Sequence, residues 1–358
     1  MRTALVTGGS GTVGLRLVRE LSRMGNWRVI VASRRGAPAE GDALPGVEYL
    51  ALDLLDRSAC IAAMSGVGGV THLLNAARHD FETGKAESAD ANTAMLSNVL
   101  DALRETRQPL EHVHLVHGTK YYGSNLGPFS TPASEEAPRS QQPTFYYDQE
   151  DLVIARSAAD GWHWSTSRPH AVVDPERGLP RSIPTIIAVY ASISRELGWP
   201  LCFPGTPENY RARYQFTDAG LLARAIAWMS TDAGARDKAF NVNNGDSIRW
   251  CDLWPRIADY FGMECGPVRT TRLAEVMPGR RDAWHRLVER HGLRSPAYEV
   301  LAMWAYGDFV FTPSWDHLFS TRRCRQIGFR ETLETEGMIF RMFDRLRALG
   351  FVPRVRTS

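Results

Sequence analysis

The chain has no strong excess of charge of either sign. It carries 42 lysine and arginine residues against 40 aspartate and glutamate residues, a formal net charge of +2. Proteins whose main partner is nucleic acid or an anionic membrane usually show a marked basic excess. The near-neutral balance favours neither class, so we expect no nucleic-acid partner and no membrane partner, and any basic site has to be local.

Cysteines and long apolar runs are also lacking. The five cysteines, at positions 60, 202, 251, 265 and 324, form no Cys-x-x-Cys pair and no Cys/His cluster at metal-ligand spacing. This pattern excludes a disulfide-stapled scaffold, and we expect reduced thiols and no metal site. The first residues lack a basic segment followed by a long apolar run, which is typical of secretion signals. We therefore expect a cytoplasmic protein.

Lysine is scarce as well. Lys85, Lys120 and Lys238 are the only three lysines, so nearly all the positive charge is arginine. Arginine does not replace the compact ammonium of lysine in a tight catalytic pocket. A lysine that falls within a motif is therefore not the product of a lysine-rich background.

What the chain does have is the composition of a packed globular protein, with 44% hydrophobic and 23% charged residues. Its first half alternates β-branched apolar runs with amphipathic stretches, a pattern typical of βαβ units in a parallel sheet. Strands are expected at Thr3–Thr7, Trp27–Ala32, Val47–Leu52, His72–Asn75, Val113–Val116, His163–Ser167 and Ala239–Val242. Helices are expected at Val13–Met24, Ser58–Met64, Thr93–Arg104, Tyr147–Ala159, Leu221–Met229, Trp250–Phe261 and Met338–Leu349.

A glycine-rich segment joins the first expected strand to the first expected helix. In this context the glycines predict a dinucleotide site, because they allow backbone N–H groups to approach a pyrophosphate at the helix N-terminus. The alternative is a glycine-rich turn that binds no ligand. The predicted cofactor contacts in this segment are Thr7, Gly8, Gly11, Thr12, Val13 and Gly14.

The end of the second strand indicates which dinucleotide would bind. NAD sites usually carry an acidic residue there, whereas NADP sites offer arginine to the 2′-phosphate. This chain has Ser33, Arg34 and Arg35 at that place and no acid, which predicts NADPH as cofactor. Two solvated surface arginines are the alternative interpretation.

Further cofactor contacts are predicted where later strands end. Asp53, followed by Leu54, comes after the third strand and is expected beside the adenine, although an ordinary turn aspartate would fit too. Asn75 and Ala76 follow the fourth strand, where the chain has to pass close to the cofactor. Pro169, Ala171 and Tyr147 complete the predicted set.

These observations predict an α/β protein with a Rossmann-type doubly wound parallel sheet and a smaller, discontinuous C-terminal substrate lobe. The expected NADP-binding domain covers residues 1–175, with returning segments near 210–245. Residues 176–209 and 246–358 are expected to form mainly the lobe. The segment Gly123–Thr144 is a long predicted loop, and loops of this length often line sites.

The glycine segment and the turn Asn75-Ala76-Ala77-Arg78 resemble the extended short-chain dehydrogenases/reductases. Classical members of that superfamily carry a serine and a Tyr-x-x-x-Lys motif after the fifth strand. No tyrosine of this chain has a lysine four residues later. The standard catalytic pair is therefore absent.

Two other segments stand in its place. The first is His117-Gly118-Thr119-Lys120-Tyr121-Tyr122-Gly123, and the second is Phe145-Tyr146-Tyr147-Asp148-Gln149-Glu150-Asp151. Together they resemble the G-x-K-x-Y and F-Y-Y-x-x-E-D segments of the progesterone 5β-reductase/iridoid synthase-like family. Weaker similarities run through Trp164–Pro169, Phe203–Thr206 and Ala239–Asp246, whereas three extra residues, Ser124-Asn125-Leu126, precede the Gly127-Pro128-Phe129 segment.

The resemblance implies a reductase that transfers hydride from NADPH to the β-carbon of an enone or enal. Negative charge then develops on the carbonyl oxygen, which needs a hydrogen-bond donor. Tyr147 is the predicted donor with Lys120 beside it, and Tyr146 is the rival because the helix register is open by a residue or two. The alternative is that Tyr147 and Lys120 have only structural roles. Phe129, Tyr122 and Phe145 are expected to contact the substrate.

Two other functions stay open at this point. One is an extended-type carbonyl reductase or nucleotide-sugar epimerase, which the missing Tyr-x-x-x-Lys motif weakens. The other is a non-catalytic NADP-binding regulator, since a fold does not fix a function. The expected partner is a small enone or enal, and a homodimer is compatible with the sequence.

Overall fold

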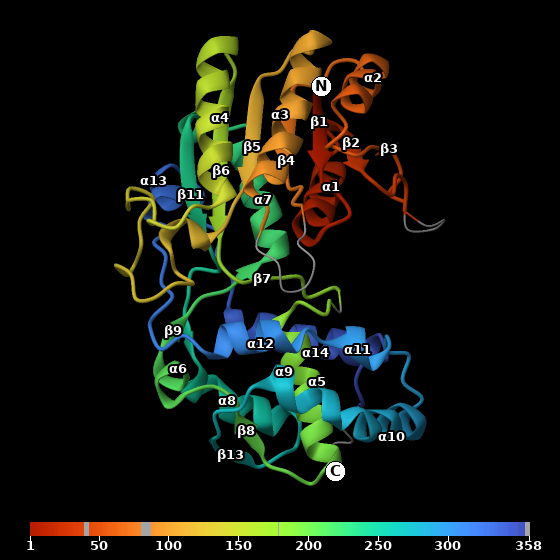
Figure 1. The fold of residues 1–358 in the computed structure, drawn as a ribbon, viewed down its shortest axis with the longest axis vertical. Coiled ribbons are helices and arrows are strands. Elements are labelled where there is room, and N and C mark those ends of the chain that lie inside the picture. The colour runs from red at the N-terminus through yellow and green to blue at the C-terminus, as the bar shows by residue number, and fades with distance from the viewer. Residues whose placement is uncertain (39–42, 80–86, 178, 355–358) are drawn as a thin grey trace.

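The structure, a computed structural model, describes residues 1–38, 43–79, 87–177 and 179–354. Figure 1 shows two parts, one built around a parallel sheet and one that is mainly helical. Among the described residues, no helix combines the length and the apolar sequence that are needed to cross a bilayer.

Seven parallel strands form the central sheet, in the order β11-β6-β5-β4-β1-β2-β3. They are β1 (Arg2–Thr7), β2 (Trp27–Ser33), β3 (Val47–Ala51), β4 (His72–Asn75), β5 (His112–Val116), β6 (His163–Pro169) and β11 (Lys238–Val242). The strand order reverses between β1 and β4, and such a switch point opens a crevice at the carboxyl ends of the strands. The predicted Rossmann-type fold is confirmed.

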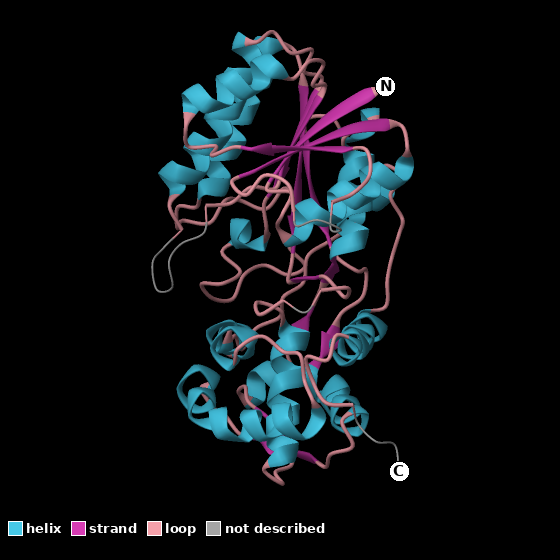
Figure 2. Ribbon diagram, turned by 90° about the vertical axis from the view of Figure 1, so that its right-hand side faces the viewer, coloured by secondary structure: helices cyan, strands magenta, loops and turns pink. Residues whose placement is uncertain are grey.

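Helices cover both faces of this sheet (Figure 2). They are α1 (Thr12–Met24), α2 (Arg57–Gly66), α3 (Ala89–Glu105), α4 (Phe145–Asp160) and α7 (Ala219–Met229), with two short 3₁₀ helices, η1 (Thr119–Tyr122) and η2 (Ala233–Ala235). Because side chains alternate along a strand, Ala4 and Val6 pack with α1 and α7, whereas Leu5 packs with α2 and α3.

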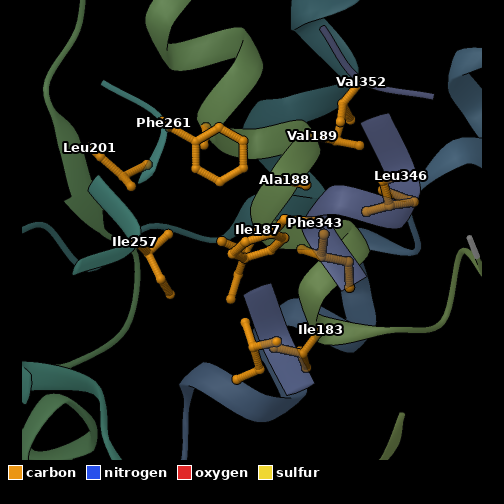
Figure 3. Close-up of a cluster of buried hydrophobic side chains, with 14 of the residues drawn as sticks. Ile183, Ile187, Ala188, Val189, Leu201, Ile257, Phe261, Phe343, Leu346 and Val352 are labelled. Carbon is orange, nitrogen blue, oxygen red and sulfur yellow. The ribbon is translucent and has the colours of Figure 1, made fainter. Parts of the chain in front are cut away.

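The second part, called the lobe below, contains the largest cluster of buried apolar residues. Its elements are α5 (Ile183–Glu196), β8 (Leu201–Phe203), α6 (Pro207–Arg211), α8 (Trp250–Tyr260), β13 (Cys265–Val268), α9 (Leu273–Val276), η3 (Met277–Arg280), α10 (Arg281–His291), α11 (Tyr298–Leu301), α12 (Trp304–Phe311) and α14 (Thr335–Ala348). Figure 3 shows how Ile187 of α5, Ile257 of α8 and Phe343 of α14 meet in this core.

Several short elements lie between or beside these parts: β7 (Val172–Val173), β9 (Arg213–Tyr214), β10 (Thr217–Asp218), β12 (Ile248–Arg249) and α13 (Arg322–Gln326). Helix α13 falls in the range expected for the lobe, yet its Cys324 packs against β11 and α7 of the sheet part. Pro184 stands in the first turn of α5, where its missing N–H costs nothing.

Candidate functional site

The glycine loop between β1 and α1 can hold an anion. Gly8 has a φ of +69°, and a Cβ atom there would lie 2.6 Å from the Ala76 carbonyl oxygen, so only glycine fits at this place. Gly11 caps α1 without a side-chain hydrogen bond, and the first turn holds no acidic residue. The free N–H groups and the positive end of the helix macrodipole therefore fit a cofactor pyrophosphate.

A cavity of about 550 Å³ extends from this loop along the carboxyl ends of the strands. Most of the predicted cofactor residues line it: Gly8, Gly11, Thr12, Val13, Ser33, Arg34, Arg35, Asp53, Leu54, Ala76, Pro169 and Ala171. Further lining residues, outside the predicted cofactor contacts, are the rival donor Tyr146 and Ser10, Arg78, His117, Arg181 and Tyr306. We name this cavity the cofactor pocket.

Four of the predicted contacts do not line the cofactor pocket. The Thr7 hydroxyl donates a 2.6 Å hydrogen bond to Asn75 Oδ1, so these two residues tie β1 to β4 beneath the loop. Gly14 serves close packing, since a Cβ atom there would lie 2.3 Å from the Gly8 carbonyl oxygen. The fourth residue, Tyr147, lies outside the lining of the cofactor pocket.

Arg34 and Arg35 are exposed at the pocket, directly after β2. Neither pairs with a carboxylate among the described residues, so both guanidinium groups are free to meet an anion. Asp53 uses one carboxylate oxygen to accept a hydrogen bond from the Leu55 N–H, which holds the turn after β3 in place. These positions fit the ribose and adenine end of a dinucleotide.

A second cavity, of about 170 Å³, lies between the sheet part and the lobe. It includes Lys120 and His170 from the sheet part and Tyr214, Phe309 and His317 from later in the chain. The residues that line both this cavity and the cofactor pocket are His117, Tyr146, Pro169, Ala171, Val172, Arg181 and Tyr306. We name the second cavity the substrate pocket, because a molecule there would meet the inner end of the cofactor pocket.

The two adjacent tyrosines of α4 point to different places. The Tyr146 ring stacks on His117, with ring centroids 4.6 Å apart, and lines both pockets. A Cβ atom at Gly118 would lie 3.1 Å from the Tyr146 hydroxyl, so glycine leaves room beside this oxygen. Burial raises the pKa of Tyr146 to about 12, and the phenol therefore keeps its proton at neutral pH.

Tyr147 is engaged in holding a loop. Its hydroxyl donates a 2.6 Å hydrogen bond to the Tyr121 carbonyl oxygen and accepts a 2.7 Å hydrogen bond from the Ser140 N–H. In the part of the chain that the structure describes, Tyr147 does not line the cofactor pocket or the substrate pocket. The predicted donor, Tyr147, is thus hydrogen-bonded to η1 and the long loop, whereas its rival, Tyr146, lines both pockets.

Lys120 lies in η1 and lines the substrate pocket together with Tyr146. Its ammonium lies 3.2 Å from Glu87 Oε1, and the Arg78 guanidinium lies 3.4 Å from the same oxygen. One carboxylate thus holds two cations at the edge of the pockets.

The three predicted substrate contacts lie in three different environments. Phe145 lines the cofactor pocket. Phe129 stacks on Phe319, with centroids 5.5 Å apart, and makes an edge-to-face contact with His317. Tyr122 is buried, and its hydroxyl donates to Asn241 Oδ1 at 2.6 Å. None of these three residues lines the substrate pocket.

Histidines contribute to the pocket walls as neutral rings. His170 stacks on His317 with centroids 5.1 Å apart, and Thr119 Oγ1 lies 2.7 Å from its Nδ1 atom. Burial lowers the pKa of His170 well below its usual value and lowers that of His117 to about 3. Next to His170, Ala171 has a φ of +44°, an unusual conformation for alanine that places backbone strain where the pockets meet.

A buried polar network holds η1 and α4 against the sheet. Arg168 of β6 pairs with Glu150 of α4 at 2.8 Å, and both side chains are almost fully buried. The Arg168 guanidinium also lies 3.3 Å from the Tyr121 ring centroid, and the Tyr121 hydroxyl donates to Glu150 Oε2 at 2.9 Å. Arg139 of the long loop reaches the same carboxylate at 2.9 Å. The network thereby fixes the two segments that carry Lys120 and Tyr146.

Comparison with known proteins identifies relatives that cover nearly the whole chain. The family model described as "PRISE-like Rossmann-fold domain" matches residues 53–353. An (S)-8-oxocitronellyl enol synthase from Nepeta racemosa is 30% identical over 370 residues, which cover 99% of this chain and 92% of that protein. A 3-oxo-Delta(4,5)-steroid 5-beta-reductase from Arabidopsis thaliana is 29% identical and covers 98% and 93% of the two chains.

Solved structures with the same fold are more distant in sequence. A UDP-glucose 4-epimerase from Thermus thermophilus in complex with NAD is 18% identical, with a TM-score of 0.66. The alignment covers 97% of this chain and 99% of that one. This similarity shows that the two proteins share the same fold.

The buried network makes a prediction about stability. Replacing Glu150→Gln leaves the Arg168 guanidinium buried without its counter-charge, which is expected to lower the free energy of unfolding by about 3 kcal/mol. Asp151→Asn is the matched control, because Asp151 pairs with the same Arg139 but its side chain is 62% exposed. Such a pair contributes less than about 1 kcal/mol.

Urea unfolding of the cofactor-free protein, followed by circular dichroism, measures both changes. Equal unfolding midpoints for the two variants would show that the buried pair does not hold this region together.

Proposed function

Since this chain belongs to the family of PRISE-like Rossmann-fold domain proteins, we propose that it catalyses the NADPH-dependent 1,4-reduction of enones and enals. It is an oxidoreductase of the short-chain dehydrogenase/reductase superfamily, and its substrate is a small molecule. The proposal of 1,4-reduction rests on the protonated phenol of Tyr146, which lies where the cofactor pocket meets the substrate pocket.

The surroundings of Tyr146 favour conjugate reduction over carbonyl reduction. The residue four positions later is Glu150, which forms an ion pair with Arg168. Helix α4 therefore has no lysine at this position to relay a proton to the phenol. Carbonyl reduction produces an alkoxide, which needs a proton as it forms. Conjugate reduction produces an enolate, a weaker base that needs chiefly a hydrogen-bond donor at its oxygen.

When bound, NADPH supplies the hydride. The chain's own residues then have three tasks. The Tyr146 hydroxyl donates a hydrogen bond to the substrate carbonyl oxygen, which strengthens as negative charge develops there. The Lys120 ammonium adds positive charge at the pocket edge, and the aromatic walls of the substrate pocket exclude water. The enolate then leaves the pocket and takes up its proton at the α-carbon from bulk water.

Binding of the cofactor is assigned to three groups of residues. The N–H groups at the start of α1 would hold the pyrophosphate, and Asp53 would lie beside the adenosine. Arg34 and Arg35 would bind the 2′-phosphate, which is the basis for proposing NADPH over NADH.

Product analysis tests the proposed reaction. Purified protein is mixed with NADPH and a panel of enones and enals that includes cyclohexenone, and the products are identified by mass spectrometry. Cyclohexanone is the expected product. Cyclohexenol would instead indicate the carbonyl reductase alternative, and tight NADPH binding without turnover of any panel member would indicate a non-catalytic regulator.

A pair of variants tests the assigned donor. Tyr146→Phe removes the hydroxyl at the pocket junction and is expected to lower kcat for enone reduction by a factor on the order of 10²–10³, as for loss of an oxyanion donor. Tyr147→Phe removes only the contacts to Tyr121 and Ser140, so kcat is expected to stay within a few-fold of the wild-type value. The reverse ranking of the two variants in steady-state kinetics would return the donor role to Tyr147.

Another variant tests the choice of cofactor. Replacing both Arg34 and Arg35 by alanine is expected to raise the Kd of NADPH by about 10- to 100-fold, because charge-assisted hydrogen bonds to the phosphate are lost. The Kd of NADH should change little. Arg23→Ala, at an exposed position outside the pocket, is the control. Titration of the nicotinamide fluorescence gives both constants, and a parallel weakening of NADH and NADPH would refute the assignment.

A further inference from the structure

Arg181 occupies an unusual place in this molecule. It comes just before α5 of the lobe, yet it lines both the cofactor pocket and the substrate pocket. Its guanidinium lies 5.2 Å from the ring centroid of Tyr306 of α12, which also lines both pockets. The lobe thus presents a cation, seated over an aromatic ring, at the junction where Tyr146 lies.

Among the described residues, cations outnumber carboxylates around this junction. Glu87 is the carboxylate that meets Lys120 and Arg78, at 3.2 and 3.4 Å. Arg181 forms no ion pair with any carboxylate of the residues that the structure describes. An arginine at a ligand pocket, with no counter-charge among the described residues, is suited to an anionic group of the ligand, because its planar fork matches a carboxylate.

We propose that Arg181 binds a carboxylate on the substrate, so that the natural substrate is a compact enone or enal that carries an anionic group. This inference rests on the proposed function and specifies the substrate class of the same site. The substrate pocket has a volume of about 170 Å³. That is below the roughly 300–1,000 Å³ of pockets for drug-sized ligands, which favours a molecule of one ring or a short chain.

Tyr146 and Arg181 together would hold the substrate at two points. Tyr146 comes from α4 of the sheet part and would bind the carbonyl oxygen, whereas Arg181 comes from the lobe and would bind the carboxylate. A substrate held at both ends has its C=C bond fixed between the two parts, over the inner end of the cofactor pocket. Burial raises the pKa of Tyr146, and the positive charge of Arg181 acts in the opposite direction.

The anion that Arg181 binds could also belong to the cofactor, whose phosphates carry the same chemistry. The experiment therefore measures the ligands separately. The probes are 3-oxocyclohex-1-ene-1-carboxylate and its methyl ester, which share the enone and differ in charge. Calorimetry gives the Kd of each probe for enzyme saturated with NADP⁺ and the Kd of NADPH for the free enzyme, and steady-state kinetics gives kcat/KM for both probes.

We expect wild-type enzyme to bind the acid at least tenfold more tightly than the ester. Arg181→Gln should abolish this preference without changing the Kd of NADPH, and Arg181→Lys should retain part of it. Arg272→Gln is the control, because Arg272 is an exposed lobe arginine outside both pockets. Matching circular dichroism spectra and melting temperatures establish that the variants are folded.

Three outcomes would overturn the inference. Equal affinity for acid and ester in the wild type would show that the pocket does not select an anion. An Arg181→Gln variant that keeps the acid preference would move the selectivity to another residue, and one that weakens only NADPH would assign Arg181 to the cofactor. If only the ester is reduced, the proposed reaction stands. If the acid binds selectively but is not reduced, the inference about Arg181 stands and the proposed reaction is contradicted.

Discussion

The ion pair between Arg168 and Glu150 is the constraint on which the site depends. Glu150 stands four residues after Tyr146, the position that a relay lysine would need, and its carboxylate is buried against Arg168 at 2.8 Å. An unpaired charge in that environment would be costly, so the pair holds α4, η1 and β6 in one arrangement. The phenol of Tyr146 is thereby held at the pocket junction with no lysine beside it on α4.

The sheet and the cofactor loop could be predicted from sequence because their information is local. Alternation of β-branched runs with amphipathic stretches identifies parallel strands, and Gly8 and Gly14 stand where close backbone contacts exclude a Cβ atom. The residues that close the site could not be found this way. Arg181 and Tyr306 come from the lobe, more than 100 residues apart in sequence, and only packing of the lobe against the sheet brings them to Tyr146.

The choice between the two tyrosines turned on one boundary. The sequence pattern predicted a helix from Tyr147, whereas the side chain of Thr144 caps the helix and α4 begins at Phe145. Each residue along an α-helix turns the side chain by about 100°, since one turn takes 3.6 residues. Adjacent residues therefore face different surroundings: Tyr146 faces the pockets, and Tyr147 faces the loop at Ser140.

We propose that Tyr146 holds the substrate oxygen where the two pockets meet. A crystal structure of the enzyme with NADP⁺ and phenol, whose ring and oxygen resemble the enolate of cyclohexenone, tests it most directly. We predict that the phenol oxygen lies within about 3 Å of the Tyr146 hydroxyl oxygen, a hydrogen-bond distance. A phenol bound in the substrate pocket with its oxygen turned away from Tyr146 would contradict this role of Tyr146.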